Sequence, residues 1–225
     1  MNYEIAGEHV KYDSCQPEII DRFKSRFVSH DTVPTITIDL ASLPTYIEAH
    51  WKLSAVQAEL IFSLQQFFAG ALRNNKLLLH ASVVKNGGSC CIFAGHSAAG
   101  KSTIACQFAT LIPGASVVSD DRTVIGLSGG QLLVWSTPWG KTDGCPRAGY
   151  PVRSVVYIEP DTSNEIETIS LERMKKFCAG MYPPQFESDI GNMLDILFPN
   201  ANLYLLKNGM TYFSAGMLNR IHHDL

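Results

Sequence analysis

One ten-residue stretch has the residue types and the spacing that bind phosphate groups. Residues 94–103 read Ala-Gly-His-Ser-Ala-Ala-Gly-Lys-Ser-Thr, and Gly95, Gly100, Lys101 and Ser102 fit the pattern G-x-x-x-x-G-K-[ST]. In such a loop the backbone N–H groups surround a polyphosphate, and glycine lets the backbone come close to it. The lysine reaches the outer phosphates, and the serine hydroxyl is a Mg²⁺ ligand. The stretch therefore predicts a site for nucleotide phosphates and magnesium.

The flanking residues support this interpretation. The apolar residues 89–94 predict a strand that leads into the loop, and residues 102–110 predict a helix that leads out of it. The N-terminus of that helix is the positive end of its dipole and faces the bound anion. His96 is expected either to be solvated or to touch a phosphate. The predicted nucleotide-binding residues are Gly95, His96, Ser97, Ala98, Ala99, Gly100, Lys101, Ser102 and Thr103.

Two adjacent carboxylates, Asp120 and Asp121, follow the next apolar strand, which we expect over residues 115–119. A phosphate-loop enzyme needs a second acidic site for its magnesium ion, and a strand end is the usual place for it. One carboxylate can bind the metal while the other orients and deprotonates an attacking hydroxyl. The alternative is an ordinary aspartate-rich turn.

His80 lies within an apolar strand expected over residues 77–84. A histidine in a buried strand is more often a packed core residue than a catalyst. However, the turn at residues 85–88 predicts a hairpin, which sets this strand beside the one that leads to the phosphate loop. The hairpin would bring the imidazole toward the phosphates.

Three further side chains are candidate substrate contacts. Arg122 and Arg147 are candidates for a phosphate or a substrate, with an ordinary surface arginine as the alternative. Trp139 is a candidate for the wall of a substrate groove, or it packs under a loop.

Composition limits the classes of protein. The 225 residues are 46% hydrophobic and 17% charged, which suits a substantial core. The net charge of −3 and the lack of a basic run argue against nucleic acid as a partner. The longest apolar runs are too short to span a bilayer, and acidic residues near the start interrupt any signal peptide. The six cysteines form no C-x-x-C pair, which favours free thiols and a cytoplasmic location.

The hydrophobic pattern divides the chain into a β-rich segment over residues 1–50 and a phosphate-loop domain over residues 51–225. The first segment reads as short strands and turns. Ser54 is a favourable N-cap for a helix over residues 54–73. Because a hairpin precedes the phosphate loop, we expect a mixed sheet in an α/β domain. Further strands are expected at 123–127, 131–135 and 153–158, helices at 171–179, 189–198 and 215–223, and a hairpin of 203–206 with 210–213.

The ordered set Leu79-His80-Ala81, the hairpin, the phosphate loop and Val118-Ser119-Asp120-Asp121 resembles the C-terminal catalytic domain of HPr kinase/phosphorylase. The resemblance covers roughly residues 77–122. It implies a phosphoenolpyruvate carboxykinase-like phosphate-loop fold with a mixed, largely antiparallel sheet. The whole chain resembles shorter HPr-kinase-related proteins, some from lasso-peptide-type gene clusters, in which similar kinases phosphorylate a serine of a precursor peptide.

The resemblance implies a role for each site residue. Lys101 and the loop backbone would bind the phosphates of ATP, and Ser102 would bind Mg²⁺. Asp120 would be the general base toward a serine hydroxyl, Asp121 would assist the metal, and His80 would lie beside the transferring phosphoryl group. Homo-oligomerisation stays open, since HPr kinase itself is a hexamer.

The chain also departs from the family. Thr103 stands where HPr kinase has a metal-assisting glutamate, and Ala98 replaces the middle glycine of the loop. The family's later glycine-rich segment, which helps to dock HPr, is not recognisable. We therefore expect an ATP- and Mg²⁺-dependent kinase of a peptide, a protein or a small molecule that bears a hydroxyl. The alternatives are a non-catalytic ATP-binding module and a kinase of a serine-like metabolite.

Overall fold

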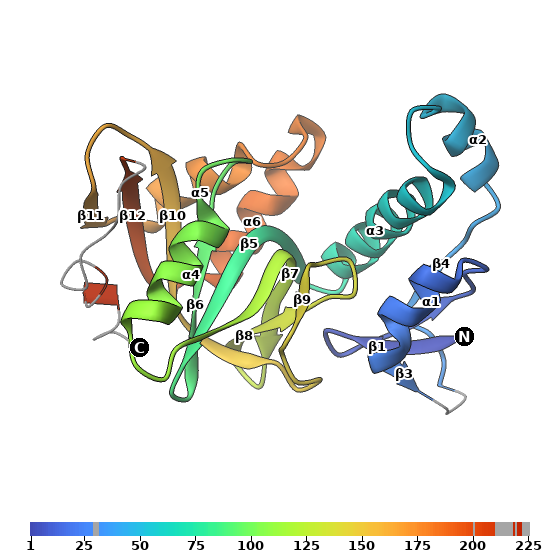
Figure 1. Cartoon of the computed structure of the whole chain (residues 1–225), viewed down its shortest axis with the longest axis horizontal. Coiled ribbons are helices and arrows are strands. Elements are labelled where there is room, and N and C mark those ends of the chain that lie inside the picture. The colour runs from blue at the N-terminus through green and yellow to red at the C-terminus, as the bar shows by residue number, and fades with distance from the viewer. Residues whose placement is uncertain (29–31, 200, 210–217, 219, 222–225) are drawn as a thin grey trace.

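The computed structural model describes residues 1–28, 32–199, 201–209, 218, 220 and 221 of the chain. Its main sheet is mixed and largely antiparallel, with strand order β11-β12-β10-β6-β5-β7-β8 and β9 paired to β7 (Figure 1). Only β10 pairs in parallel, with β6 and with β12, among the main-sheet strands described. These strands are β5 Lys76–Asn86, β6 Ser89–Ala94, β7 Ser116–Ser128, β8 Gln131–Ser136, β9 Thr142–Asp143, β10 Tyr150–Pro160, β11 Glu165–Thr168 and β12 Asn202–Asn208.

The hairpin before the phosphate loop is confirmed. β5 and β6 pair antiparallel, from Ala81 opposite Ala94 to Asn86 opposite Ser89. The loop follows β6 and leads into helix α4 (Lys101–Leu111). β5 therefore has the strand of the phosphate loop on one side and β7 on the other.

The expectation that a strand ends at the two aspartates is wrong. β7 is a single strand of 13 residues that contains both of them. The reason is the length of β5, an 11-residue strand that pairs with β7 from Lys85 opposite Ser116 to Lys76 opposite Gly126. The two short strands expected at residues 115–119 and 123–127 both pair with β5, so they form one continuous strand. The aspartates consequently lie in the interior of a sheet strand.

Helices cover both faces of this sheet (Figure 1). On one face, Ile104 and Phe108 of α4 share a core with Phe93 of β6 and Val156 of β10. On the other face, helices α5 (Leu171–Ala179) and α6 (Glu187–Leu197) bury side chains against β5 and β6. Both helices agree with the sequence expectation. The phosphate loop is therefore held between two packed layers.

The N-terminal segment contains more than strands and turns. Its strands are β1 (Asn2–Ile5), β2 (Glu8–Tyr12), β3 (Phe27–Val28) and β4 (Ile36–Ile38), in the order β3-β1-β2-β4. The sequence expectation missed helices α1 (Pro17–Phe23) and α2 (Leu43–Ala49), as well as the short 3₁₀ helix Lys24–Arg26. Proline occupies the first turn of both α-helices, where its missing N–H is tolerated.

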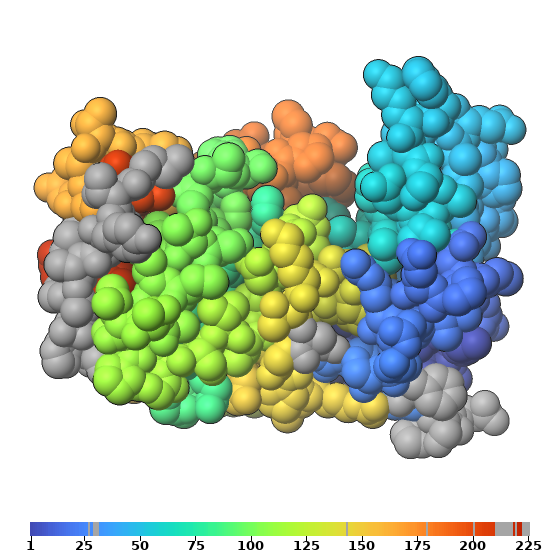
Figure 2. Space-filling view, viewed as in Figure 1, coloured from blue at the N-terminus to red at the C-terminus, as the bar shows by residue number. Residues whose placement is uncertain are grey.

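Helix α3 (Ala55–Arg73) is confirmed, with Ser54 and Gln57 forming a reciprocal capping box. Its Phe67 shares one core with the N-terminal strands and with Trp139. Glu8 of β2 is buried and forms an ion pair with Lys76 of β5. The blue and cyan N-terminal region accordingly lies directly against the yellow segment around residue 140 in Figure 2.

The C-terminal expectations are only partly covered by the structure. β12 pairs with β10 and with β11. The second strand of the expected hairpin, residues 210–213, lies outside the described residues, as does most of the helix expected over 215–223. A 3₁₀ helix, Pro184–Phe186, precedes α6. None of the helices described is long and apolar enough to cross a membrane.

Candidate functional site

At two positions, the backbone of the phosphate loop adopts a conformation that favours glycine. Gly95 has φ +154°, and a Cβ there would lie 2.7 Å from the backbone oxygen of Ile158. Gly100 has φ +96°, and a Cβ there would lie 2.5 Å from Nδ2 of Asn208. Both positions exclude a side chain, so the loop depends on the glycines of the motif.

Asn208 supports the loop from the end of β12. Its buried Nδ2 donates a hydrogen bond to the carbonyl of Ala99 at 2.9 Å. The sequence expectation treated Asn208 only as part of a turn and missed this role. Its one signal was an amide side chain at the end of an apolar strand.

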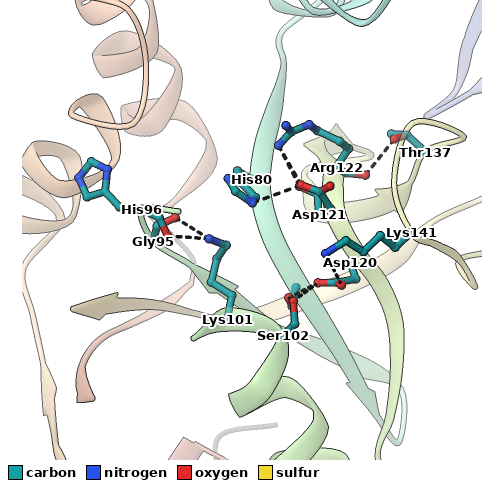
Figure 3. A network of polar contacts seen from close by, with 11 residues as sticks. His80, Gly95, His96, Lys101, Ser102, Asp120, Asp121, Arg122, Thr137 and Lys141 are labelled. Carbon is teal, nitrogen blue, oxygen red and sulfur yellow. Dashed lines mark hydrogen bonds and ion pairs between the residues drawn. The ribbon is translucent and has the colours of Figure 1, made fainter. Parts of the chain in front are cut away.

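Lys101 lies folded over the loop (Figure 3). Its Nζ donates to the carbonyl oxygens of Gly95 at 3.0 Å and His96 at 2.8 Å. Burial lowers the pKa of Lys101, while the carboxylates of Asp121 and Asp120 act in the opposite direction. The loop, Lys101 and the start of α4 present one cluster of hydrogen-bond donors to an anion.

Asp120 joins three elements at the base of the loop. Its Oδ1 accepts hydrogen bonds from Ser82 of β5 and from Ser102 of α4, the latter at 2.8 Å (Figure 3). Burial alone would raise the pKa of Asp120, but the hydrogen bonds from the two serines and the charge of Lys141 lower it overall. Asp120 is therefore held as a carboxylate beside the motif serine.

Asp121 lies on the other side of this site, together with His80 and Arg122. Its Oδ1 lies 3.2 Å from Nε2 of His80 and 3.0 Å from NH1 of Arg122. In a regular strand, Asp121 would point away from the face that carries Asp120, toward the buried core around Ala81. Its φ of +77° breaks this alternation, and its carboxylate reaches the face of Asp120 and His80.

His80 belongs to the site and is half-buried. Burial lowers the pKa of His80, and the charges of Lys101 and Arg122 lower it further, whereas Asp121 raises it. The net direction is downward, so the ring is neutral at pH 7. A neutral imidazole can donate its Nε2–H to the Asp121 carboxylate without neutralising its charge.

A pocket of about 390 Å³ lies at the mouth of the loop, and His80, Lys101 and Ser102 line it. Asp120 and Asp121 lie directly behind Ser102 and His80. Lys141 also lines the pocket. Lys141 comes from the segment after β8, and its Nζ lies 3.7 Å from Oδ2 of Asp120. The sequence analysis missed Lys141, because a lone lysine in a loop gives no signal. The lining residues that matter to phosphate binding are His80, Ser97, Lys101, Ser102, Thr103 and Lys141.

Several predicted residues lie elsewhere. The ring of His96 points away from the loop and lies edge-on to Tyr157, with ring centroids 6.3 Å apart. Trp139 is buried between Phe23 and Phe67, so it does not line a groove. Of the two alternatives for Trp139, the structure agrees with packing under a loop, because its indole completes the core shared with the N-terminal segment.

Arg147 also lies outside the pocket. Its NH1 lies 3.5 Å from Glu4, and its NH2 donates to the carbonyl of Ser25 at 3.3 Å. These contacts agree with the alternative of an ordinary surface arginine for Arg147, because the N-terminal segment engages its guanidinium. Arg122, in contrast, is part of the site through Asp121.

The donor set fits magnesium shared with a nucleotide. Ser102 and Asp120 offer a hydroxyl and a carboxylate side by side, the hard oxygen donors that Mg²⁺ prefers. Among the described residues, no group of three or more His, Cys, Asp and Glu side chains could hold a metal. Mg²⁺ commonly takes one or two protein ligands and completes its shell with phosphates and water. The site is thus suited to a metal that arrives with phosphates.

No model of a known protein family matches the chain, and a search of the curated proteins finds no significant match. Its function is therefore inferred from the site itself.

Proposed function

We propose that the protein is an ATP- and Mg²⁺-dependent phosphotransferase that acts on a serine-type hydroxyl. One observation supports this most strongly. Two neighbouring aspartates of β7 contact two residues that line one pocket: Asp120 contacts the motif serine Ser102, and Asp121 contacts His80. A module that only binds ATP needs the loop and the metal ligand, but it does not need a second carboxylate in a left-handed conformation.

The contacts favour a division of roles opposite to the one that the resemblance implies. Asp120, with its lowered pKa and its hydrogen bond from Ser102, suits the magnesium site. The ion pairs of Asp121 with His80 and Arg122 hold its carboxylate in place, and the side chain is 26% exposed, so a substrate hydroxyl can reach it. We therefore assign Asp120 to the metal and Asp121 to the general base, with His80 as the residue that orients this base.

In this mechanism the acceptor oxygen forms a bond to the γ-phosphorus as the bond to the β–γ bridging oxygen breaks. The acceptor proton passes to Asp121, and ADP is the leaving group. Lys101 and the N–H groups of the loop bind the phosphates and offset their charge. Mg²⁺, when bound, contributes further neutralisation of the phosphate oxygens.

The strand arrangement around the site also supports a particular fold, and the buried cysteines support a cellular location. A hairpin that leads into the phosphate loop, followed by the aspartate pair on an adjacent antiparallel strand, supports a phosphoenolpyruvate carboxykinase-like fold of the HPr-kinase type. We place the protein in the cytoplasm, where ATP is available and buried thiols such as Cys90 and Cys91 stay reduced.

Two alternatives have specific support. Thr103, in place of the family's glutamate, favours a non-catalytic ATP-binding module in a complex with a partner. Trp139 is buried and Arg147 contacts Glu4 outside the pocket, so neither candidate substrate contact lines the pocket. This placement favours a small hydroxylated metabolite over a peptide or protein acceptor.

Mass spectrometry of reactions with ATP and Mg²⁺ tests the proposal. The acceptors are the peptides and proteins encoded beside the gene, and free serine. One acceptor should gain the mass of a phosphoryl group, and Asp121→Asn should abolish this gain. Lys11→Ala, an exposed change on β2, is the matched control and should leave it intact. ATP binding without any acceptor gain would instead support the non-catalytic module.

A further inference from the structure

Lys141 reaches the phosphate site from a segment that lies outside the motif. Its backbone N–H donates to the carbonyl of Asp120 at 2.9 Å, which fixes the segment against β7. Its Nζ faces Oδ2 of Asp120, whereas Ser102 donates to Oδ1. The side chain is 67% exposed, so the ammonium lies at the open side of the pocket.

We propose that Lys141 is a second catalytic cation, which binds the terminal phosphate of the nucleotide from the side opposite Lys101. Figure 3 shows the Lys101 ammonium beside Gly95 and His96 and the Lys141 ammonium beside Asp120, with Ser102 between the two lysines. Phosphoryl transfer spreads negative charge over the equatorial oxygens of the transferring group, and a cation beside them lowers the barrier. This inference rests on the proposed function for its catalytic part, but the binding of the terminal phosphate does not depend on turnover.

The position of Lys141 depends on the N-terminal part of the chain. Trp139 lies two residues before Lys141. Its ring centroid is 4.9 Å from that of Phe23 and 4.8 Å from that of Phe67. Its Nε1 also donates to the hydroxyl of Ser63 in α3 at 2.9 Å. Gly140 then passes so close to β7 that a Cβ would lie 2.8 Å from the carbonyl oxygen of Asp120.

Arg26 holds the segment at both of its ends. This buried guanidinium donates through NH2 to the hydroxyl of Ser136 at 3.0 Å and to the carbonyl of Cys145 at 3.1 Å. Ser136 precedes the segment and Cys145 follows it. Arg26 and Trp139 are therefore positioning residues for Lys141, and the N-terminal segment is a support of the site.

Calorimetry with ATP and with ADP tests the role of Lys141. Because ADP lacks the terminal phosphate, Lys141→Ala should weaken ATP binding on the order of 10-fold and leave ADP binding unchanged. The rate of transfer should fall on the order of 10- to 100-fold, and Lys141→Arg should restore much of both quantities. Lys11→Ala is the control with the same change of charge. The proposal would be overturned if Lys141→Ala left both affinities unchanged, or if it weakened ATP and ADP binding by the same factor.

A double-mutant cycle tests the positioning role. Arg26→Lys should reduce the preference for ATP over ADP in the wild-type background and have no further effect in the Lys141→Ala background. Equal effects in both backgrounds would contradict the positioning role. If Arg26→Lys fails to fold in a thermal unfolding test, Ser63→Ala replaces it, since the Trp139 ring stays and its hydrogen bond to the Ser63 hydroxyl is lost.

The two proposals can fail separately. A wild-type protein that transfers no phosphoryl group, yet loses its ATP preference on Lys141→Ala, would refute the kinase and retain the phosphate-binding lysine. A wild-type protein that transfers phosphoryl at a rate unaffected by Lys141→Ala would retain the kinase and refute the catalytic role of Lys141.

Discussion

The hydroxyl of Ser102 donates a hydrogen bond to Oδ1 of Asp120 at 2.8 Å, although the two residues belong to different elements and lie 18 positions apart. Ser82 of the intervening strand β5 donates to the same oxygen. The order β6-β5-β7 makes this contact possible, because β5 brings the start of α4 and the middle of β7 to one place. The motif serine and a carboxylate are therefore already adjacent, and their oxygen atoms can serve as two ligands of one metal ion.

Lys101→Ala should weaken the binding of ATP on the order of 10- to 100-fold and abolish transfer. The substitution removes the cation that lies over the loop carbonyls and that we propose to bind the phosphates. Isothermal titration calorimetry in the presence of Mg²⁺ measures the change, with Lys11→Ala as the control. An unchanged affinity would show that the loop does not bind phosphates.

Asp120→Asn and Asp121→Asn should have separable effects, since each keeps the shape of its side chain. Asp120→Asn should raise the Mg²⁺ concentration required for nucleotide binding, because it removes charge beside Ser102. Asp121→Asn should leave Mg²⁺-dependent binding intact and lower transfer on the order of 100-fold or more. Titration of Mg²⁺ against ATP binding and turnover distinguishes them. The reverse pattern would return the base to Asp120.

Protonation of His80 should lower both the free energy of unfolding and the turnover rate at acid pH. Burial and the charges of Lys101 and Arg122 lower the pKa of His80, with Asp121 opposing them. The unfolded chain therefore binds the proton first as the pH falls below about 6.5. The contribution of His80 to the free energy of unfolding is therefore complete above that pH. It declines as the pH falls through the lowered pKa of His80 in the folded protein.

Chemical denaturation at a series of pH values measures this effect on stability. His80→Gln cannot titrate, so its stability should lose that part of the pH dependence. In the wild-type protein, protonated His80 would also pair more strongly with Asp121 and make it a weaker base, so turnover should fall in the same range. Identical pH profiles for the two proteins would contradict the prediction.

Gly95→Ala should destabilise the protein and prevent nucleotide binding. The new Cβ would meet the backbone oxygen of Ile158 at 2.7 Å, in a conformation that side chains rarely adopt. Gly88→Ala is the matched control, because nothing lies within 4 Å of a Cβ there. Thermal unfolding and ATP calorimetry should show a large change for the first variant and a small one for the second.

Glu8→Ala should lower the free energy of unfolding by about 3–5 kcal/mol. Glu8 accepts hydrogen bonds from Lys76, Asn74 and Thr35, and both members of its ion pair with Lys76 are largely buried. The substitution leaves the Lys76 ammonium buried without its counter-charge. Urea denaturation measures the loss, and exposed Glu48→Ala should change it little. A loss as small as that of the control would show that the N-terminal segment contributes little to stability.

The sequence by itself determined the features that depend on local chemistry. The phosphate loop follows from glycine at two positions and from the lysine and serine that come next in the chain. Helix α3 follows from its apolar period and its N-cap, and the hairpin of β5 and β6 follows from a short turn between apolar runs. The presence of Asp120, Asp121 and His80 in one site was also predictable, because a single hairpin and one further strand bring them together.

Only the tertiary structure decided which aspartate faces which partner, because that depends on strand register and on one unusual dihedral angle. A shift of one residue in β7 would exchange the faces of its side chains, and the φ of Asp121 overrides the alternation altogether. Lys141, Arg26 and Asn208 reach the site or its support through contacts between segments far apart in the chain. Trp139 illustrates the same limit, since the N-terminal strands and α3 bury an aromatic residue that a local pattern places beside a substrate.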